Sequence, residues 1–293
     1  MKQSITAVIP AKNEEKNIER SIKSVSWCDR ILILWMGDDK TGQISRKLGA
    51  EVVEMNKSQE DDFIAVQKNV NWAIDNCKTD WILRIDADEE ATNDLKKEIQ
   101  EILATGGTGN SPSLSLRAVS VGAWQSGQKN IDWIASATPR NDTDNVVAFG
   151  IPRKQFFFGG FLKGGDWAYD KLVRLFRPKF ARYEPLVQVH EQFKVNGNIG
   201  YLKNPLLHYS HPDLETAINK FNSYTSVEIE DLKEGYISAL LEMIFLPPYI
   251  FLRWMIWHHG WRDGLRGLVA GLFRAWYEFI LYAKYLERKL YRL

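Results

Sequence analysis

Strand-like and helix-like patterns alternate along roughly the first 100 residues of the chain. Ile5 to Ile9 is an apolar run with β-branched residues, and the segment after it carries apolar Ile18, Ile22 and Val25 at helical spacing. Further strand-like segments follow at 30–34, 51–54 and from 81, with helix-like segments at 41–50 and 63–76 between them. Such alternation predicts an α/β fold, a mostly parallel sheet flanked by helices. Ligands of these sheets bind at the carboxyl ends of the strands.

Composition sets broad limits on the function. The net charge of +1 gives no electrostatic case for nucleic acid as a partner. The two cysteines have no metal or redox spacing, which favours a reducing cytosolic setting, and the strand-like start of the chain predicts no signal peptide. We expect a catalytic domain over residues 1–235, with a turn-rich excursion at about 105–145, and a helical tail over 236–293. The oligomeric state is not predicted.

The segment 81–90, WILRIDADEE, places two aspartates directly after an apolar strand-like run. Because side chains two apart on an extended backbone share a face, Asp86 and Asp88 are predicted to project together from the end of the strand. Two such carboxylates can hold Mg²⁺ or Mn²⁺, which can in turn bind the phosphates of a nucleotide diphosphate. The alternative is a helix N-cap with a solvated charge, since a helix-like segment follows.

Several motifs occur in an order that resembles glycosyltransferase family 2, most of all its lipopolysaccharide-core glucosyltransferase branch. They are IPAKNEEKNIERSIKSV, a Gly-Asp turn after the second strand, AVQKNVNWAI, LRIDADE, IPRKQFF, KLVRLFRP, VHEQF and LLHYSH. The resemblance covers about residues 4–215. It implies a GT-A fold, which is a Rossmann-like sheet flanked by helices, together with a nucleotide-sugar donor, a divalent metal and transfer that inverts the anomeric carbon.

The resemblance also assigns roles around the metal. Asp86 matches the family position near the ribose and the metal, and Asp88 matches the metal ligand itself. His208 matches a histidine that often serves as a further ligand, and its alternative role is a core histidine on an apolar strand. The implied cofactor is Mg²⁺ or Mn²⁺.

A second group of matched positions belongs to the nucleotide. Pro10, Asn13 and Glu14 come from the first motif. Gln67, Lys68 and Asn69 match a segment that lines the diphosphate, although Lys68 could equally be a solvated helix cation. After the second strand this chain departs from the family, because Trp35 replaces an aspartate that binds the base or ribose, while Asp39 keeps the last aspartate of that pattern. A tryptophan could stack on a base instead.

Two carboxylates are candidates for the general base that inverting transfer requires. Glu191, in VHEQF, occupies the place where the family keeps its catalytic acidic residue. Asp170, in GGDWAYDK, follows a glycine-rich segment that could approach the sugar closely. Glu191 is the favoured base.

The tail is rich in aromatic residues, and it carries eight Lys or Arg against four Asp or Glu over residues 236–293. Pro247-Pro248 is expected to interrupt its first apolar stretch, which therefore predicts an interfacial or re-entrant hairpin. A second stretch has an apolar stripe at 3.6-residue spacing, flanked by basic residues, consisting of Leu265, Leu268, Leu272, Trp276, Phe279, Ile280 and Ala283. This composition favours a helix lying in an anionic membrane surface. The alternative is a helix packed on the catalytic domain or on a second subunit.

Together these features predict an enzyme of cell-envelope and lipopolysaccharide biosynthesis at the cytoplasmic face of the inner membrane. It would move a sugar from a nucleotide-sugar donor, a UDP-sugar in the first instance, to a lipid-linked glycan. Two alternatives stay open: a polyprenyl-phosphate glycosyltransferase, and a catalytically silent module that binds a sugar nucleotide or glycan.

Overall fold

The computed structural model describes residues 3–56, 63–105, 146–169, 171–184 and 193–291. The chain forms two compact units. The first comprises Met1–Arg153 and Lys171–Leu207, and the second comprises Lys154–Asp170 and His208–Leu293. The division at residue 235 that the sequence suggests stays a prediction.

The first unit is built around one mixed sheet with the strand order β3-β2-β1-β4-β8-β6-β12-β5, and β11 also pairs with β6. Neighbouring strands are parallel from β3 to β4, and β8 runs antiparallel to both β4 and β6. The strands are β1 (Ile5–Ala11), β2 (Arg30–Trp35), β3 (Glu51–Glu54), β4 (Trp81–Arg84), β5 (Glu89–Ala91), β6 (Val146–Phe157), β8 (Lys171–Phe176), β11 (Asn198–Tyr201) and β12 (Leu206–His208). The predicted parallel α/β sheet is therefore confirmed over the first four of its ordered strands.

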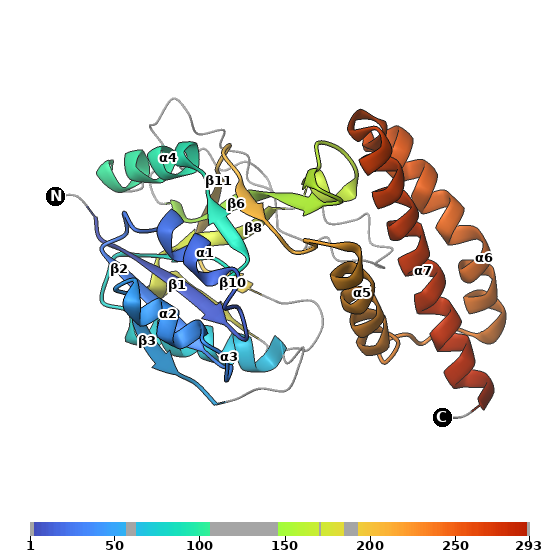
Figure 1. Cartoon of the computed structure of the whole chain (residues 1–293), viewed down its shortest axis with the longest axis horizontal. Helices are drawn as coiled ribbons and strands as arrows, with labels where there is room; N and C mark the ends of the chain where they lie inside the picture. The colour runs from blue at the N-terminus through green and yellow to red at the C-terminus, as the bar shows by residue number, and fades with distance from the viewer. Residues whose placement is uncertain (1–2, 57–62, 106–145, 170, 185–192, 292–293) are drawn as a thin grey trace. The chain divides into compact units, whose positions relative to one another are not determined.

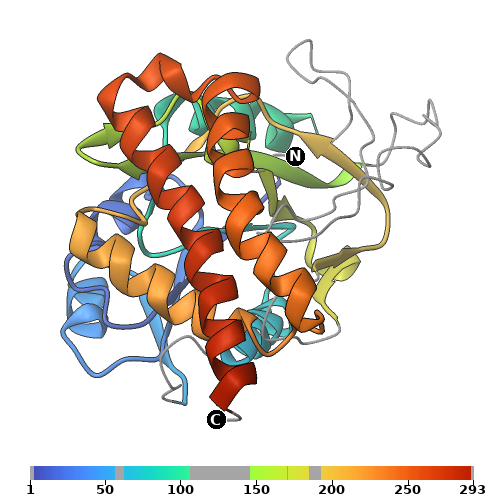
Figure 2. The ribbon, with the colours of Figure 1, turned by 90° about the vertical axis from the view of Figure 1, so that its right-hand side faces the viewer.

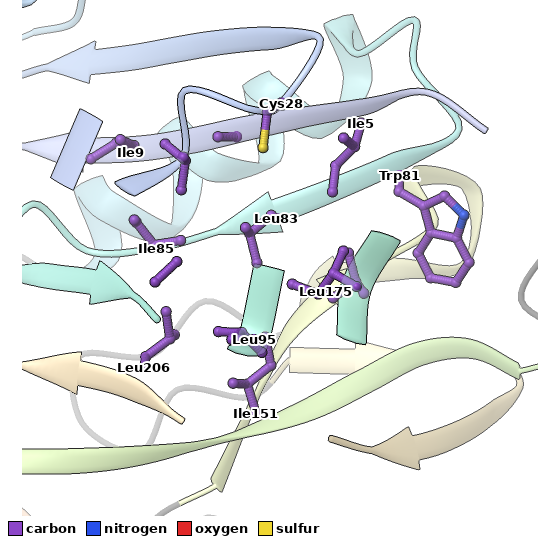
Figure 3. Close-up of a cluster of buried hydrophobic side chains, with 14 of the residues drawn as sticks. Ile5, Ile9, Cys28, Trp81, Leu83, Ile85, Leu95, Ile151, Leu175 and Leu206 are labelled. Carbon is purple, nitrogen blue, oxygen red and sulfur yellow. The ribbon is translucent and has the colours of Figure 1, made fainter. Parts of the chain in front are cut away.

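Helices cover both faces of this sheet because the side chains of each strand alternate between the faces. On one face, Ile5 and Ile9 of β1 and Leu83 of β4 pack with helices α1 (Ile18–Ser24) and α4 (Asn93–Ala104). Figure 3 shows this cluster, with Trp81, Ile151 and Leu175 in it. On the other face, Val8, Leu32 and Ile82 pack with α3 (Phe63–Asn76) and with the paired strands β9 (Ala181–Tyr183) and β10 (Phe193–Val195). Helix α2 (Thr41–Lys47) joins β2 to β3.

A side chain of α3 pairs with the backbone of a strand. The strands β9 (Ala181–Tyr183) and β10 (Phe193–Val195) form a small antiparallel sheet. The Asn71 Nδ2 atom donates to the carbonyl of Tyr183, and Asn71 Oδ1 accepts from the Tyr183 N–H, both at 3.0 Å. These bonds are buried, so Asn71 provides hydrogen-bond partners for two backbone groups that water does not reach.

We expect the Asn71→Leu variant to be destabilised by about 2–4 kcal/mol, because it leaves two buried backbone groups unpaired. Chemical denaturation monitored by tryptophan fluorescence measures the change. Asn76→Leu is the matched control, since Asn76 lies on the same helix and is exposed. An equal loss in both variants would mean that the cost comes from the helix and not from the Asn71 hydrogen bonds.

The second unit is mainly helical. Its helices are α5 (Leu214–Glu228), α6 (Tyr236–Leu252) and α7 (Leu265–Tyr291), and the short strand β7 (Gly160–Phe161) pairs with the end of β6. Helices α6 and α7 pack side by side as a hairpin, which is visible in Figures 1 and 2. Their connection contains a π-helical turn, Arg253–Trp257, and a 3₁₀ turn, Gly260–Asp263.

The expected interruption at Pro247-Pro248 is wrong, because both prolines lie inside the continuous helix α6. Each proline removes one backbone donor, and the packing of α6 along α7 supplies the support that a lone helix would lack. Among the residues that the structure describes, the 22-residue segment Tyr236–Trp257 is long and apolar enough to cross a membrane by length and composition.

The apolar stripe predicted for α7 is partly exposed. Of its residues, Leu265, Leu268, Leu272 and Phe279 are exposed, and Trp276, Ile280 and Ala283 are half-buried. The buried side of α7 carries other residues, Tyr277, Leu281 and Tyr285. On α6 the exposed apolar side chains recur at helical spacing and are Ile237, Leu241, Ile244, Phe245, Tyr249 and Leu252. Both helices thus have an apolar surface that the second unit itself leaves uncovered.

Candidate active site

Asp86 and Asp88 lie in a turn and not on an extended strand. Strand β4 ends at Arg84, and the Glu89 N–H donates to the Asp86 carbonyl at 3.0 Å, which closes a turn over residues 86–89. The premise that strand alternation places the two carboxylates on one face is therefore wrong. The position at the carboxyl end of a central parallel strand is as expected, since β4 pairs with β1. Both aspartates are half-buried.

The Asp86 carboxylate is paired with arginines on both of its oxygens. Arg174 Nη2, from β8, lies 2.5 Å from Asp86 Oδ2, and Arg84 Nη2 lies 3.1 Å from Oδ1. Both guanidinium groups are buried, and the Arg174 side chain is only 1% exposed. Asp86 is consequently fixed in place by two positive charges before any ligand binds.

Glu89 completes this buried cluster. Its side chain is fully buried, and Oε2 accepts the Asp86 N–H at 2.8 Å. Its other oxygen, Oε1, lies 3.4 Å from Arg153 Nη1 and 3.5 Å from Arg174 Nη2. A buried charge is tolerated when it is paired and hydrogen-bonded, so Glu89 and the arginines hold the turn that carries Asp88.

Hydrogen bonds join the loop after β1 to the loop after β2, and β1 is the neighbour of β4 in the sheet. Pro10 lies in β1, Asn13 has a left-handed backbone (φ 53°), and Asn13 Oδ1 accepts the Asp38 N–H at 3.2 Å. The Glu14 N–H donates to Thr41 Oγ1 at 2.8 Å. Because β1 and β2 are parallel neighbours, these contacts gather the expected nucleotide residues Asn13, Glu14 and Asp39 at one edge of the sheet.

Asp39 is the centre of that arrangement. Its carboxylate accepts from the N–H of Thr41 and of Glu15, both at 3.0 Å, and from Thr41 Oγ1 at 2.8 Å. Burial alone would raise the pKa of Asp39, but these hydrogen bonds outweigh it and hold the pKa below its ordinary value. Asp39 is therefore ionised at neutral pH and shapes the loop that would face a nucleotide.

Trp35 packs against helix α2. A Cβ atom at Gly42 would lie 2.7 Å from Trp35 Cε3, so only glycine allows this approach. The Arg46 guanidinium carbon lies 5.9 Å from the centre of the indole ring. The ring that the sequence suggested for base stacking thus has a structural role between β2 and α2.

The three candidates on α3 differ in burial. Gln67 is buried, Lys68 is exposed and Asn69 is half-buried. Consecutive side chains leave a helix about 100° apart, so the three do not form one face. Their contact with the diphosphate stays a prediction, as does the alternative of a solvated Lys68.

Of the remaining predicted residues, the structure describes His208 alone. His208 ends β12, is half-buried and belongs to the second unit. Glu191 and Asp170 lie outside the described residues. Over the part of the chain that the structure describes, no three His, Cys, Asp or Glu side chains gather as a metal cluster.

The donor set nevertheless fits one divalent cation. Carboxylate oxygen is the ligand that Mg²⁺ and Mn²⁺ prefer, and such ions are commonly held by one or two carboxylates together with substrate phosphates. Both Asp86 oxygens face guanidinium groups, so Asp86 shapes the turn, and the role of Asp88 as the metal ligand stays a prediction.

Sequence reasoning missed Arg84, Arg153, Arg174 and Glu89. A usable signal was present, because Arg174 stands inside the apolar run LVRLF and Arg84 inside WILRI. An arginine on a buried strand needs a carboxylate partner, and the acidic segment after β4 supplies one.

The comparisons with known proteins agree on a family. The sequence model described as Glycosyl transferase family 2 matches residues 6–206. A glycosyltransferase of uncharacterised activity from Rickettsia bellii is 27% identical over 98% of this chain and 88% of its own length. The lipopolysaccharide core biosynthesis glycosyltransferase LpsC of Rhizobium meliloti is 24% identical over 98% of this chain and 93% of its own length.

Solved structures are more distant. Staphylococcus aureus TarS aligns with 97% of this chain and 55% of its own, at 12% identity and a TM-score of 0.43. Glucosyl-3-phosphoglycerate synthase from Mycobacterium tuberculosis, solved with Mn²⁺ and UDP-glucose, aligns with 30% of this chain and 34% of its own, at 24% identity and a TM-score of 0.25.

The sheet, the acidic turn after β4 and the family match together define a nucleotide-sugar-dependent transferase. The chain belongs to glycosyl transferase family 2. The predicted family, the GT-A-like fold and the enzyme class are thereby confirmed.

Proposed function

We propose that this glycosyltransferase transfers a sugar from a UDP-sugar to a lipid-linked glycan, such as a lipopolysaccharide core, with inversion of the anomeric carbon. The observation that carries the proposal is the rigid acidic turn at the end of β4, beside the joined loops after β1 and β2. This is the edge of the sheet where α/β proteins bind nucleotides.

Asp88 would hold the Mg²⁺ or Mn²⁺ ion, and a bound ion would neutralise the diphosphate as a leaving group. The chain's own residues orient the donor. The ion pairs of Asp86 with Arg84 and Arg174 fix the turn, and Asp39 fixes the neighbouring loop. The preorganised turn spares the enzyme the cost of ordering it when the donor arrives.

The acceptor side of the proposal rests on similarity and on surface chemistry. A relative that is 24% identical over nearly the whole chain is named for lipopolysaccharide core biosynthesis. The exposed apolar side chains of α6 and α7 favour attachment to a membrane, and basic residues in the tail favour anionic lipid. The cytoplasmic face of the inner membrane is where UDP-sugars and such an acceptor would meet.

The proposal is tested by thermal unfolding of the protein with a panel of nucleotide sugars, with and without Mn²⁺. We expect UDP-sugars to raise the Tm in the presence of metal and to shift it little in the presence of chelator, because only a ligand that binds the folded state stabilises it. Transfer from the stabilising donor to lipopolysaccharide-core glycolipid is then measured. Stabilisation by no nucleotide sugar under any metal condition would contradict the proposal.

Membrane attachment should depend on the exposed face of α6. Leu241 and Phe245 are 50% and 64% exposed. We expect the double variant Leu241→Gln and Phe245→Gln to lose about tenfold or more of its binding to anionic vesicles, because apolar burial in lipid contributes about 25 cal/mol per Å². Flotation with anionic and neutral vesicles measures this loss, and Ile218→Gln on α5 is the exposed apolar control. Unchanged flotation of the double variant would favour a packed or dimerising tail.

A further inference from the structure

The loop between β7 and β8 is bound closely by the connection between α6 and α7, and both belong to the second unit. A Cβ atom at Gly164 would lie 2.3 Å from the carbonyl oxygen of His259. At Gly165, whose φ is +81°, it would lie 2.2 Å from Cζ2 of Trp254. Because these two glycines lack a Cβ atom, the backbone of the loop can pack directly against the α6–α7 connection.

Hydrogen bonds fasten the same contact. The Asp263 carboxylate accepts the N–H groups of Lys163 and Gly164, with Oδ2 2.9 Å from each. The Gly165 N–H donates to the His258 carbonyl at 2.8 Å. Hydrogen bonds from backbone N–H groups to a carboxylate are charge-assisted, so the bonds to Asp263 are the strongest hydrogen bonds of this contact.

An ion pair adds to the contact further along the loop. Asp166 pairs with Arg253, and Asp166 Oδ1 lies 3.4 Å from His258 Nε2. Trp254 is fully buried beneath the loop, and its Nε1 donates to the Gly267 carbonyl at 3.0 Å. Trp254 also meets Trp167 of the loop edge-on at 5.1 Å between ring centroids.

The outer side of the same connection is apolar and exposed. Ile256, Trp257, Trp261 and Leu265 are between 59% and 68% exposed. Arg262 is exposed among them, whereas the two acidic groups nearby are engaged with the loop and with Arg253. Tryptophan beside exposed arginine, with the acidic groups turned to other partners, is chemistry suited to an anionic lipid surface.

We propose that the connection between α6 and α7 is a membrane-binding tip that holds the β7–β8 loop, so that lipid contact and the order of the loop are coupled. The proposal rests on the membrane attachment proposed above and names its point of contact. The loop runs in sequence directly into β8, which carries Arg174, the partner of Asp86. A tip seated on anionic lipid would thus restrict the segment that precedes β8 in the sequence.

The hold on the loop is tested without lipid. Amide hydrogen exchange of the peptide covering residues 158–169 is compared between the full-length protein, Asp263→Asn and Asp263→Ala. We expect about tenfold or faster exchange at the loop in Asp263→Ala, with a smaller increase in Asp263→Asn, because the carboxylate accepts both N–H groups. Asp231→Asn, an exposed aspartate of the same unit, is the matched control. Unchanged loop exchange in a folded Asp263→Ala protein overturns the proposal.

The tip is tested with phosphatidylglycerol and phosphatidylcholine vesicles. We expect anionic vesicles to slow exchange of the same peptide, and the double variant Trp257→Ser and Trp261→Ser to lose flotation and this protection together. Trp72→Ser, an exposed tryptophan on α3, is the control. Flotation that survives in the double variant overturns the tip alone. Absence of flotation for the unmodified protein overturns the membrane location with it, while the lipid-free exchange experiment still decides the hold on the loop.

Discussion

The Asp88→Asn variant should lose about a hundredfold or more of transfer activity if Asp88 holds the metal as proposed. The change keeps the size of the side chain and removes the charge that would bind the ion. The effect should appear in metal affinity as well. We expect the Mn²⁺ concentration that gives half-maximal activity to rise, and the metal-dependent thermal shift with the donor to shrink. Steady-state transfer at several Mn²⁺ concentrations measures both quantities.

The matched control for this variant is Asp94→Asn. Asp94 lies in the first turn of α4 and its side chain is 74% exposed, so the same chemical change there should leave activity near that of the unmodified protein. Metal-dependent turnover that is unchanged in Asp88→Asn would remove Asp88 from the metal site. A loss of folding in that variant, judged by circular dichroism, would instead assign Asp88 to the turn.

The second large effect is expected at the general base. Glu191→Gln should lower transfer by about 10²–10⁴-fold, because a positioned base contributes that much to removing the acceptor proton. Affinity for the nucleotide sugar should stay within a few-fold, since the base acts on the acceptor and not on the donor. Single-turnover transfer and donor titration separate the two quantities.

Asp170→Asn is the paired variant, and we expect it to retain most of its transfer activity. If Asp170→Asn loses transfer and Glu191→Gln does not, the two roles are exchanged. Substantial activity in both variants would favour a polyprenyl phosphate acceptor, whose attacking phosphate needs little help from a base.

Some features followed from local chemistry. The apolar run Ile5 to Ile9 and the similar runs after it predicted the parallel strands. Apolar β-branched runs that alternate with segments of helical spacing are typical of such a sheet. The segment after Trp81 was placed at the carboxyl end of a strand for the same reason. The helix over 63–76 was also predicted at its correct bounds.

Other features depended on contacts across the chain. The turn that carries Asp88 is held by Arg174, which lies 88 residues after Asp86 in the sequence. No local pattern could assign that partner, because several arginines and several carboxylates are available in the chain. The continuity of α6 through Pro247-Pro248 likewise depends on its packing against α7.

From the residues alone we predicted the family, the order of strands and helices in the first 100 residues and the acidic segment that follows β4. These are properties of periodicity and of residue type, which each segment carries alone. The folded chain was needed to see that Asp86 is paired with arginines, that Trp35 packs on Gly42, and that Asp263 binds a distant loop. The physical reason is that pairing a buried charge, or filling the space beside a glycine, depends on which groups folding brings within a few ångströms.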